Sequence, residues 1–259
     1  MFENQIIWIT GASSGIGEAL AVAFSGEGAR LILSARDANE LERVRRLCAN
    51  PEKHIVKPLD VRDTDAITSA ASEVLRDLGH VDVLVLSAGV SQRGLAAETD
   101  LATDRAIMDI NYFGSIALTK ALLPSMIARK SGHIVPISSV IGYVGVPLRS
   151  AYSASKHALH GFFNALRAEN HKNGIRVTIV CPGYIRTKVS ENALRGDGTK
   201  HGQLDETHAK AMLPEKAAPA IVRGVAANKR EVHVGGKEIH AIRLQRFLPR
   251  LVDRVLRIK

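Results

Sequence analysis

The 259-residue sequence contains only two cysteines, Cys48 and Cys181, which lie far apart and form no CxxC spacing. Their scarcity excludes a disulfide framework and a cysteine-ligated zinc site, and it fits a reducing compartment. The ten histidines are scattered, with no HExxH or comparable paired spacing. The sequence therefore predicts no metal site.

Aromatic residues are also few, at 4% of the chain, so little material exists for stacking the bases of a single-stranded nucleic acid. The formal charge of +9 is concentrated near the end of the chain. Ten Lys and Arg against three acidic residues give +7 over Arg223 to Lys259, which leaves +2 for the preceding 222 residues. Because the body is nearly neutral, nucleic acid is not an expected partner.

Long hydrophobic runs are absent as well: no uninterrupted apolar stretch reaches the roughly 18 residues that a membrane-spanning helix needs. The first residues lack the basic start of a signal peptide and pass directly into Ile6, Ile7, Trp8 and Ile9. We expect a soluble, cytoplasmic protein. Hydrophobic residues at 46% and charged residues at 24% exclude wholesale disorder and suffice for a sizeable core.

Short β-branched and aliphatic runs alternate with longer amphipathic segments, which is the pattern of a parallel sheet with helices on both faces. The pattern predicts α/β architecture with a doubly wound parallel sheet, the Rossmann fold, as a single domain over residues 1–259. Seven strands are expected, at Ile6–Thr10, Leu31–Ala35, His54–Leu59, Val81–Leu86, Gly132–Ile137, Arg176–Cys181 and Glu231–Val234. Helices are expected at Ile16–Gly26, Ala38–Ala49, Thr64–Leu78, Leu101–Arg129, Ala151–Lys172 and Pro214–Ala227.

Two segments stand apart from this alternation. Residues 187–213 form a long insertion rich in Gly, Lys and Asp, which we interpret as a lid over a substrate. Residues 241–259 form a basic amphipathic tail, with three arginines on one stripe after Pro249. Packing of its apolar stripe on the body or on a neighbouring subunit is favoured, and peripheral contact with an anionic membrane is the less favoured alternative.

The first strand runs into the sequence TGASSGIG and then into a helix. Three glycines there permit a tight turn, close approach of a pyrophosphate and packing of the helix on the sheet, while free helix amides face the anion. Such glycines also occur in ordinary turns, but the strand and helix on either side favour dinucleotide binding. The candidate residues are Gly11, Ser13, Ser14, Gly15, Ile16 and Gly17.

Arg36 follows the second strand, where a protein that binds NAD usually offers a carboxylate to the ribose. Its guanidinium is suited to the 2′-phosphate of NADP, so NADP(H) is preferred and NAD(H) remains an alternative. A solvated arginine at a strand end is the plainer interpretation of Arg36. Asp60 and Val61, after the third strand, are placed to meet an adenine edge, although Asp60 equally suits a helix cap.

Tyr152 and Lys156 lie four residues apart in a predicted helix and share one face of it. A tyrosine titrates near ~10, so we expect the neighbouring ammonium to lower its pKa and make it a proton donor and acceptor. Ser139 ends the fifth predicted strand, where its hydroxyl can bind a carbonyl oxygen. Taken alone, Tyr152 and Lys156 would be a pair on a helix surface, and Ser139 would belong to a turn. Together with the glycine-rich turn, they fit a mechanism that combines a cofactor with an acid.

These motifs resemble those of the short-chain dehydrogenase/reductase family, and the resemblance covers nearly the whole chain. It implies that Tyr152 is the catalytic acid/base, that Lys156 lowers its pKa and binds the nicotinamide ribose, and that Ser139 orients the substrate oxygen. It further implies that Asn111 holds a water of the proton relay. Cofactor contacts are implied for Ala88, Gly89, Pro182, Gly183, Ile185 and Thr187.

The chain departs from the family pattern at one place, and the resemblance also implies an assembly. The usual Asn-Asn-Ala-Gly after the fourth strand is here Leu86-Ser87-Ala88-Gly89, which removes an asparagine that braces the sheet. A homodimer or homotetramer is implied, joined through the helices that contain Asn111 and Tyr152. Segments such as Ser91-Gln92-Arg93-Gly94 narrow the resemblance to carbonyl reductases of the dehydrogenase/reductase member 7 type.

The sequence thus predicts an NADP(H)-dependent oxidoreductase that transfers hydride between the nicotinamide and a small hydrophobic carbonyl or secondary alcohol. The segments expected around the pocket carry apolar residues, and for this reason we expect a hydrophobic substrate. The alternative is a sensor or regulatory protein that binds NADP without turnover.

Overall fold

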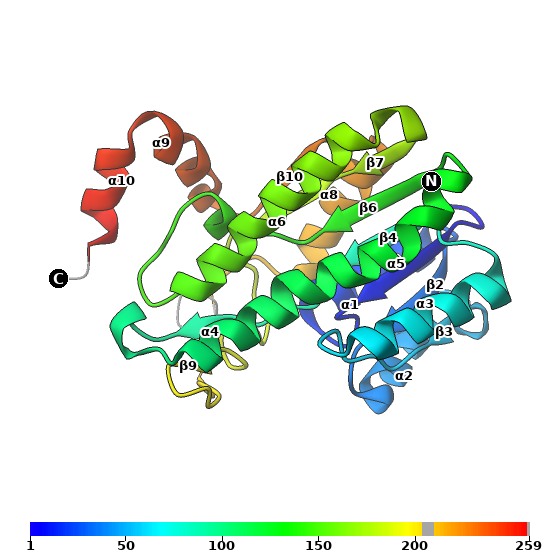
Figure 1. Ribbon diagram of the computed structural model, residues 1–259, viewed down its shortest axis with the longest axis horizontal. Helices are drawn as coiled ribbons and strands as arrows, with labels where there is room; N and C mark the ends of the chain where they lie inside the picture. The colour runs from blue at the N-terminus through cyan, green and yellow to red at the C-terminus, as the bar shows by residue number, and fades with distance from the viewer. Residues whose placement is uncertain (204–209, 258–259) are drawn as a thin grey trace.

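A six-stranded, all-parallel sheet forms the centre of the computed structural model, which describes residues 1–203 and 210–257 (Figure 1). The strand order is β3-β2-β1-β4-β6-β7, so the chain winds outward in both directions from β1. The strands are β1 (Ile6–Thr10), β2 (Arg30–Ser34), β3 (Ile55–Val56), β4 (Val83–Leu86), β6 (Gly132–Pro136) and β7 (Ile175–Val177). This arrangement confirms the predicted Rossmann-like single domain.

Beyond β7 the sheet is extended by a separate pair of strands. β8 (Ile179–Pro182) follows β7 after one residue, Thr178, and pairs in parallel with β10 (Glu231–Val234). An isolated bridge between Ile137 and Val180 joins this pair to the end of β6. The predicted strand Arg176–Cys181 is therefore divided into two strands with different neighbours.

Both faces of the sheet are apolar, and the alternation of side chains in β1 shows how the two faces are filled. Ile7 and Ile9 belong to one buried cluster, whereas Ile6 and Trp8 belong to the other. Burial of both faces is typical of parallel sheets covered by helices. The first cluster includes residues of α1 (Gly15–Gly26), α2 (Ala38–Leu47) and α8 (Pro214–Ala226). The second includes residues of α3 (Thr64–Leu78), α5 (Gly114–Ala128) and α6 (Ser150–Glu169), which lie in front of the sheet in Figure 1.

Several boundaries differ from the predicted ones. The helix predicted over Leu101–Arg129 consists of α4 (Leu101–Met108), a π-helical turn at Asp109–Phe113, and α5. The π turn adds a residue to the backbone ring, a local change that propensity does not encode. α6 ends at Glu169, before a short 3-10 turn, and β3 has two residues where six were predicted.

The predicted insertion and tail both contain regular structure. Within residues 187–213, β9 (Leu194–Arg195) pairs with β5 (Gln92–Arg93), and residues 204–209 lie outside the described part of the chain. The tail forms α9 (Ala241–Phe247) and α10 (Pro249–Leu256), which project from the body in Figure 1. Across residues 1–203 and 210–257, none of the helices combines the length and apolar character needed to cross a bilayer.

Candidate active site

One cleft, of about 1270 Å³, runs along the carboxyl ends of the parallel strands. The segments that follow β1, β2, β4, β6 and β8 all contribute to its lining, as expected for a ligand site on an open α/β sheet. The structure brings together in this cleft most of the residues selected from the sequence. They are Gly11, Ser13, Ser14, Gly15, Ile16, Arg36, Asp60, Val61, Ala88, Gly89, Ser139, Tyr152, Lys156, Pro182, Gly183, Ile185 and Thr187.

The glycine-rich turn after β1 shapes one end of the cleft. Gly11 has a φ of +66°, and a Cβ there would approach the backbone nitrogen of Ala88 to 2.7 Å. Gly17 lies outside the cleft lining, where a Cβ would collide with the carbonyl oxygen of Gly11. The first amides of α1 follow this turn and are donors for an anion. The side chain of Ser14 makes no capping bond to them in the structure.

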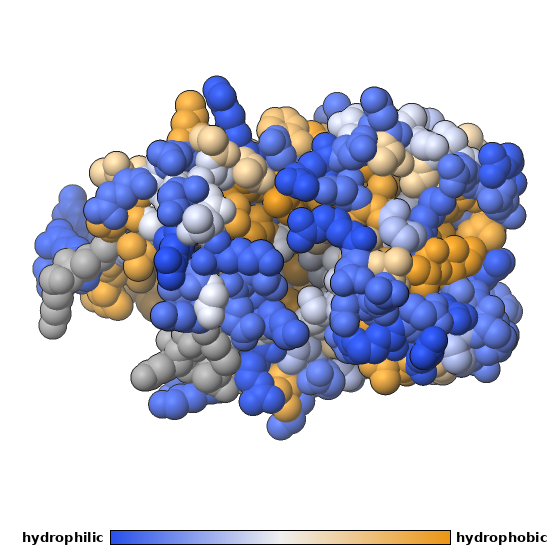
Figure 2. Space-filling model, turned by 90° about the horizontal axis from the view of Figure 1, so that it is seen from below, coloured by the Kyte–Doolittle hydropathy of each residue, from blue (hydrophilic) through white to orange (hydrophobic). Residues whose placement is uncertain are grey.

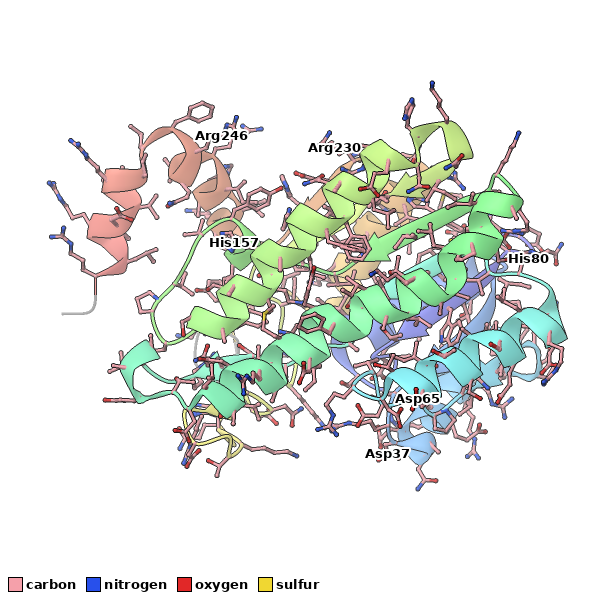
Figure 3. All side chains as sticks on the ribbon, in the orientation of Figure 1. Asp37, Asp65, His80, His157, Arg230 and Arg246 are labelled. Carbon is pink, nitrogen blue, oxygen red and sulfur yellow. The ribbon has the colours of Figure 1, made fainter. Side chains whose placement is uncertain are left out.

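Arg36 is exposed at the edge of the cleft, beyond the end of β2. The neighbouring carboxylate of Asp37 is engaged elsewhere, because it accepts hydrogen bonds from the amides of Asn39 (2.9 Å) and Glu40 (3.3 Å) and caps α2. Figure 3 shows Asp37 near the start of α2. Arg36 and Asp37 both line the cleft at this strand end, but the Asp37 carboxylate is already used by the cap of α2.

The carboxylate of Asp60 binds the guanidinium of Arg62, with the closest approach at 2.6 Å. This hydrogen bond holds the pKa of Asp60 below its usual value, despite partial burial. The helix cap that was an alternative role for Asp60 belongs to Asp63, whose side chain accepts from the amide of Ala66 at 2.9 Å. Asp60 therefore lines the cleft as a charged, oriented side chain.

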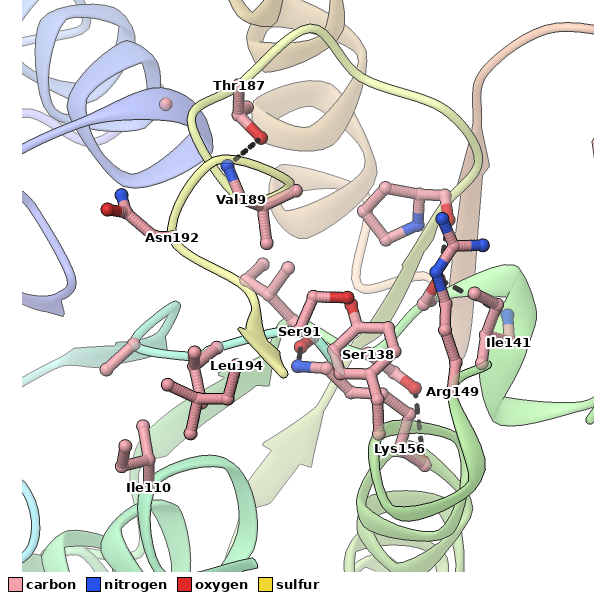
Figure 4. A pocket seen from close by; sticks show the side chains of 18 of the residues that line it. Ser91, Ile110, Ser138, Ile141, Arg149, Lys156, Thr187, Val189, Asn192 and Leu194 are labelled. Atoms are coloured by element: carbon pink, nitrogen blue, oxygen red, sulfur yellow. Dashed lines mark hydrogen bonds between the residues drawn. The ribbon is translucent and has the colours of Figure 1, made fainter. Parts of the chain in front are cut away.

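Ser139, Tyr152 and Lys156 all line the cleft. Figure 4 shows Lys156 among the side chains around it. Ser139 follows β6, and its hydroxyl donates to the carbonyl of Pro182 at 3.3 Å and accepts from the amide of Ile141 at 3.2 Å. Tyr152 and Lys156 stand on the first turns of α6. The Lys156 Nζ donates to the carbonyl of Ile137 at 2.8 Å and lies 5.6 Å from the centre of the Tyr152 ring.

Burial dominates the acid–base character of this group. It raises the pKa of Tyr152 above its ordinary value, although Arg149, a hydrogen bond with Ser139, and Arg93 oppose the shift. Burial also lowers the pKa of Lys156 to about 8. The expected lowering of the Tyr152 pKa by Lys156 is therefore not found, because desolvation of the phenolate outweighs the nearby charges. Burial thus favours the neutral, protonated phenol.

Asn111 lies behind the cleft in the π-helical turn, fully buried. Its side-chain oxygen accepts from the amide of Val90 at 2.8 Å, and its Nδ2 donates to the Val90 carbonyl and the Ser155 hydroxyl, each at 2.9 Å. Ser155 in turn donates to the Tyr152 carbonyl at 2.8 Å. Asn111 thus ties the segment after β4 to α6 beneath the catalytic candidates.

Thr10 holds the backbone of the segment that contains Ser87. The Thr10 hydroxyl oxygen lies 3.2 Å from the amide of Ser87 and 3.3 Å from that of Ala88, and it accepts from both. The backbone therefore keeps its course to Gly89, where a Cβ would stand 3.2 Å from the Asn111 side-chain oxygen and 3.5 Å from the Lys156 Nζ.

Gln92 is a site residue to which the sequence analysis assigned no role. It is completely buried in β5, and its side-chain oxygen accepts from the amides of Ala151 (2.8 Å) and Tyr152 (3.4 Å). It therefore caps the N-terminus of α6 from a distance in the sequence, and no local pattern around Tyr152 indicates this. Leu251 and Val252 of α10 also line the cleft, and no local pattern in the sequence assigns them to it.

The fold and motifs agree with comparisons to known proteins. A family model described as short chain dehydrogenase matches residues 5–197. The chain belongs to the short-chain dehydrogenase family. It is 46% identical to the dehydrogenase/reductase SDR family member 7B of Bos taurus over 88% of this chain and 73% of the relative. The corresponding protein of Danio rerio is 43% identical over 98% of this chain and 85% of the relative.

Solved structures of the family superpose on the chain. A short-chain dehydrogenase from Streptomyces avermitilis is 32% identical, with a TM-score of 0.82 and 96% of each chain covered. A metagenomic short-chain oxidoreductase in complex with NADP is also 32% identical, with a TM-score of 0.75 over 90% of this chain and 97% of that one. Membership of this family makes the chain an oxidoreductase.

Proposed function

We propose that the chain is an NADP(H)-dependent reductase of a small hydrophobic carbonyl compound, with Tyr152 as the proton donor. The convergence of Ser139, Tyr152 and Lys156 in one cleft with the glycine-rich turn is the observation that carries the proposal. The metagenomic relative holds NADP, which supports the choice of coenzyme together with the exposed Arg36 and the engaged Asp37.

The cleft fits a dinucleotide at its glycine-rich end. The first amides of α1 and the hydroxyls of Ser13 and Ser14 would hold the phosphates, and Arg36 a 2′-phosphate. Thr187 packs against this turn, since a Cβ on Gly15 would lie 2.9 Å from its methyl group. When bound, the nicotinamide supplies the hydride.

The residues of this chain would bind, orient and protonate the substrate. The Ser139 hydroxyl is fixed by Pro182 and Ile141 and would donate to the substrate oxygen as negative charge develops there. The protonated Tyr152 would give its proton to that oxygen, and the ammonium of Lys156 would stabilise the phenolate left behind. Ile110, Ile141, Val144, Val146, Val189 and Leu194 line the cleft and favour an apolar substrate.

The test is oxidation of NADPH over a panel of ketones and aldehydes, by the native chain and by Tyr152→Phe. Loss of the proton donor should reduce turnover by about 100- to 10,000-fold while NADPH binding is kept. Tight NADPH binding without turnover in the native chain would instead favour the sensor.

We further propose a cytoplasmic location, and a homodimer or homotetramer through the helices around Asn111 and Tyr152. Phe113, in the π-helical turn, is 51% exposed, and Leu101, at the start of α4, is 62% exposed. Large apolar side chains at such exposure support an interface on this face. Sedimentation equilibrium of the native chain and of Phe113→Ser tests it, because the variant should have the lower mass.

A further inference from the structure

The C-terminal segment Ala241–Leu256 leaves a row of large apolar side chains uncovered. Val252 alone among the residues of α10 is buried. The exposed members are Leu244 (40%), Phe247 (73%), Leu248 (53%), Leu251 (47%) and Val255 (74%). Apolar side chains gathered at this exposure mark a surface that meets a partner.

Positive charge accompanies these apolar side chains. Residues 241–257 contain five arginines, Arg243, Arg246, Arg250, Arg254 and Arg257, against the single acidic residue Asp253. On α10, Arg250 and Arg254 are four residues apart and form one stripe, and Leu251 and Val255 form the adjacent stripe. Figure 3 shows Arg246 at the upper side of α9, and Figure 2 shows hydrophobic and hydrophilic side chains side by side at this end.

The segment also borders the site. Leu244, Leu251, Val252, Val255 and Leu256 belong to the lining of the cleft that contains Tyr152. The uncovered apolar surface of the tail is therefore continuous with the apolar part of the cleft lining.

We propose that Ala241–Leu256 binds the surface of an anionic lipid bilayer and seats the mouth of the cleft against it. The apolar stripe would enter the boundary between headgroups and acyl chains, and the arginines would contact anionic headgroups. A second copy of the chain is the weaker occupant, because pairing this segment with itself would bring the four arginines of one copy close to the four of the other. The segment lines the same cleft as Tyr152, but binding to a bilayer does not depend on the proposed reaction and is measured without it.

Vesicle flotation of the full chain tests the proposal. The native protein should float with vesicles of phosphatidylcholine mixed with phosphatidylglycerol, remain at the bottom with phosphatidylcholine alone, and detach as salt is raised. The combined variant Arg243→Gln, Arg246→Gln, Arg250→Gln and Arg254→Gln should bind the anionic vesicles roughly 600-fold more weakly, since each basic side chain near such a surface contributes roughly fivefold.

A matched variant controls for net charge. Lys53, Lys172, Lys216 and Lys229 are exposed on the body, and changing all four to Gln removes the same charge far from the tail. This control should float like the native protein. The double variant with Phe247→Ser and Val255→Ser should not float, although it keeps its arginines. Circular dichroism melts establish that each variant is folded.

Three results would overturn the proposal. The first is a native protein that stays unbound with anionic vesicles at low salt. The second is equal loss of binding in the body control and the arginine variant, which would indicate a general charge effect. The third is a lipid-free assembly that the Phe247→Ser, Val255→Ser variant breaks apart in sedimentation, since the surface would then join copies of the chain.

Discussion

Titration of the Lys156 amine should limit the rate of carbonyl reduction at alkaline pH. Burial lowers its pKa to about 8 and raises that of Tyr152. As pH rises through 8 the ammonium loses its proton, and a neutral amine no longer stabilises the phenolate that forms when Tyr152 donates. We expect kcat/KM for ketone reduction to be flat near neutrality and to fall above about pH 8.

Lys156→Arg separates this titration from others, since a guanidinium stays charged over the same range. The variant should be slower overall, yet its pH profile should lose the fall near the lysine pKa. If kcat/KM of Lys156→Arg still fell at the same pH, the titration would belong to another group.

Arg36 should decide the choice between the two nicotinamide coenzymes. Removal of a charge-assisted hydrogen bond to a phosphate costs about 1.5–3 kcal/mol, so Arg36→Ala should weaken NADPH binding by roughly ten- to a hundredfold. NADH has no 2′-phosphate and should bind both proteins equally. Fluorescence titration with each coenzyme measures this, and an equal loss for both would remove Arg36 from phosphate recognition.

At the scale of elements, the cap of α6 is the contact that positions Tyr152. Gln92→Ala leaves the amides of Ala151 and Tyr152 without their acceptor, which should lower the free energy of unfolding by about 1–2 kcal/mol. Because Tyr152 stands in that first turn, kcat for reduction should also fall, by roughly tenfold.

Asp63→Ala is the matched control, because it removes a cap of similar kind from α3 and Asp63 does not itself line the cleft. It should lower stability to a similar extent, measured by urea unfolding, and leave kcat unchanged. If the two variants lost kcat equally, the effect of Gln92 would be one of stability and not of position.

The same helix shows what the sequence allows one to predict. Tyr152 and Lys156 are four residues apart, so their common face follows from helix geometry alone. The glycine-rich turn is equally local. The cap from Gln92 comes from β5, 59 residues before Ala151, and the π turn that holds Asn111 lies against α6, a distant segment of the chain. Tertiary contacts of this kind leave no periodic trace in the chain.

For the whole molecule, alternation of strands and helices predicted the sheet and both its covered faces because hydrophobic burial acts on every element alike. The prediction was wrong for two strands. β3 ends earlier than predicted, and the strand predicted over Arg176–Cys181 is divided at Thr178 into β7 and β8. The hydroxyl of Thr178 donates to the carbonyl of Lys229 at 2.6 Å, which anchors the division.

Two buried histidines should make the stability of the whole fold fall with acid. His133 is 1% exposed in β6, with its Nε2 2.8 Å from the Thr178 hydroxyl, and burial, aided by Arg176, lowers its pKa to about 3. His160 is buried in α6 beside Ser138, and burial lowers its pKa to about 4 against the opposing charge of Glu231, with His157, His233 and Lys156 adding to the lowering.

In the unfolded chain both imidazoles titrate near ~6.5, so below that pH the unfolded state binds more protons than the native state. The stability present above pH ~6.5 is therefore lost as pH falls toward the folded values, by roughly 4 kcal/mol between about pH 6.5 and 4.5 for the two groups together. Urea unfolding at several pH values measures the slope. His133→Gln should remove about half of it, the exposed His171→Gln should leave it unchanged, and an undiminished slope in His133→Gln would show that other groups cause the loss.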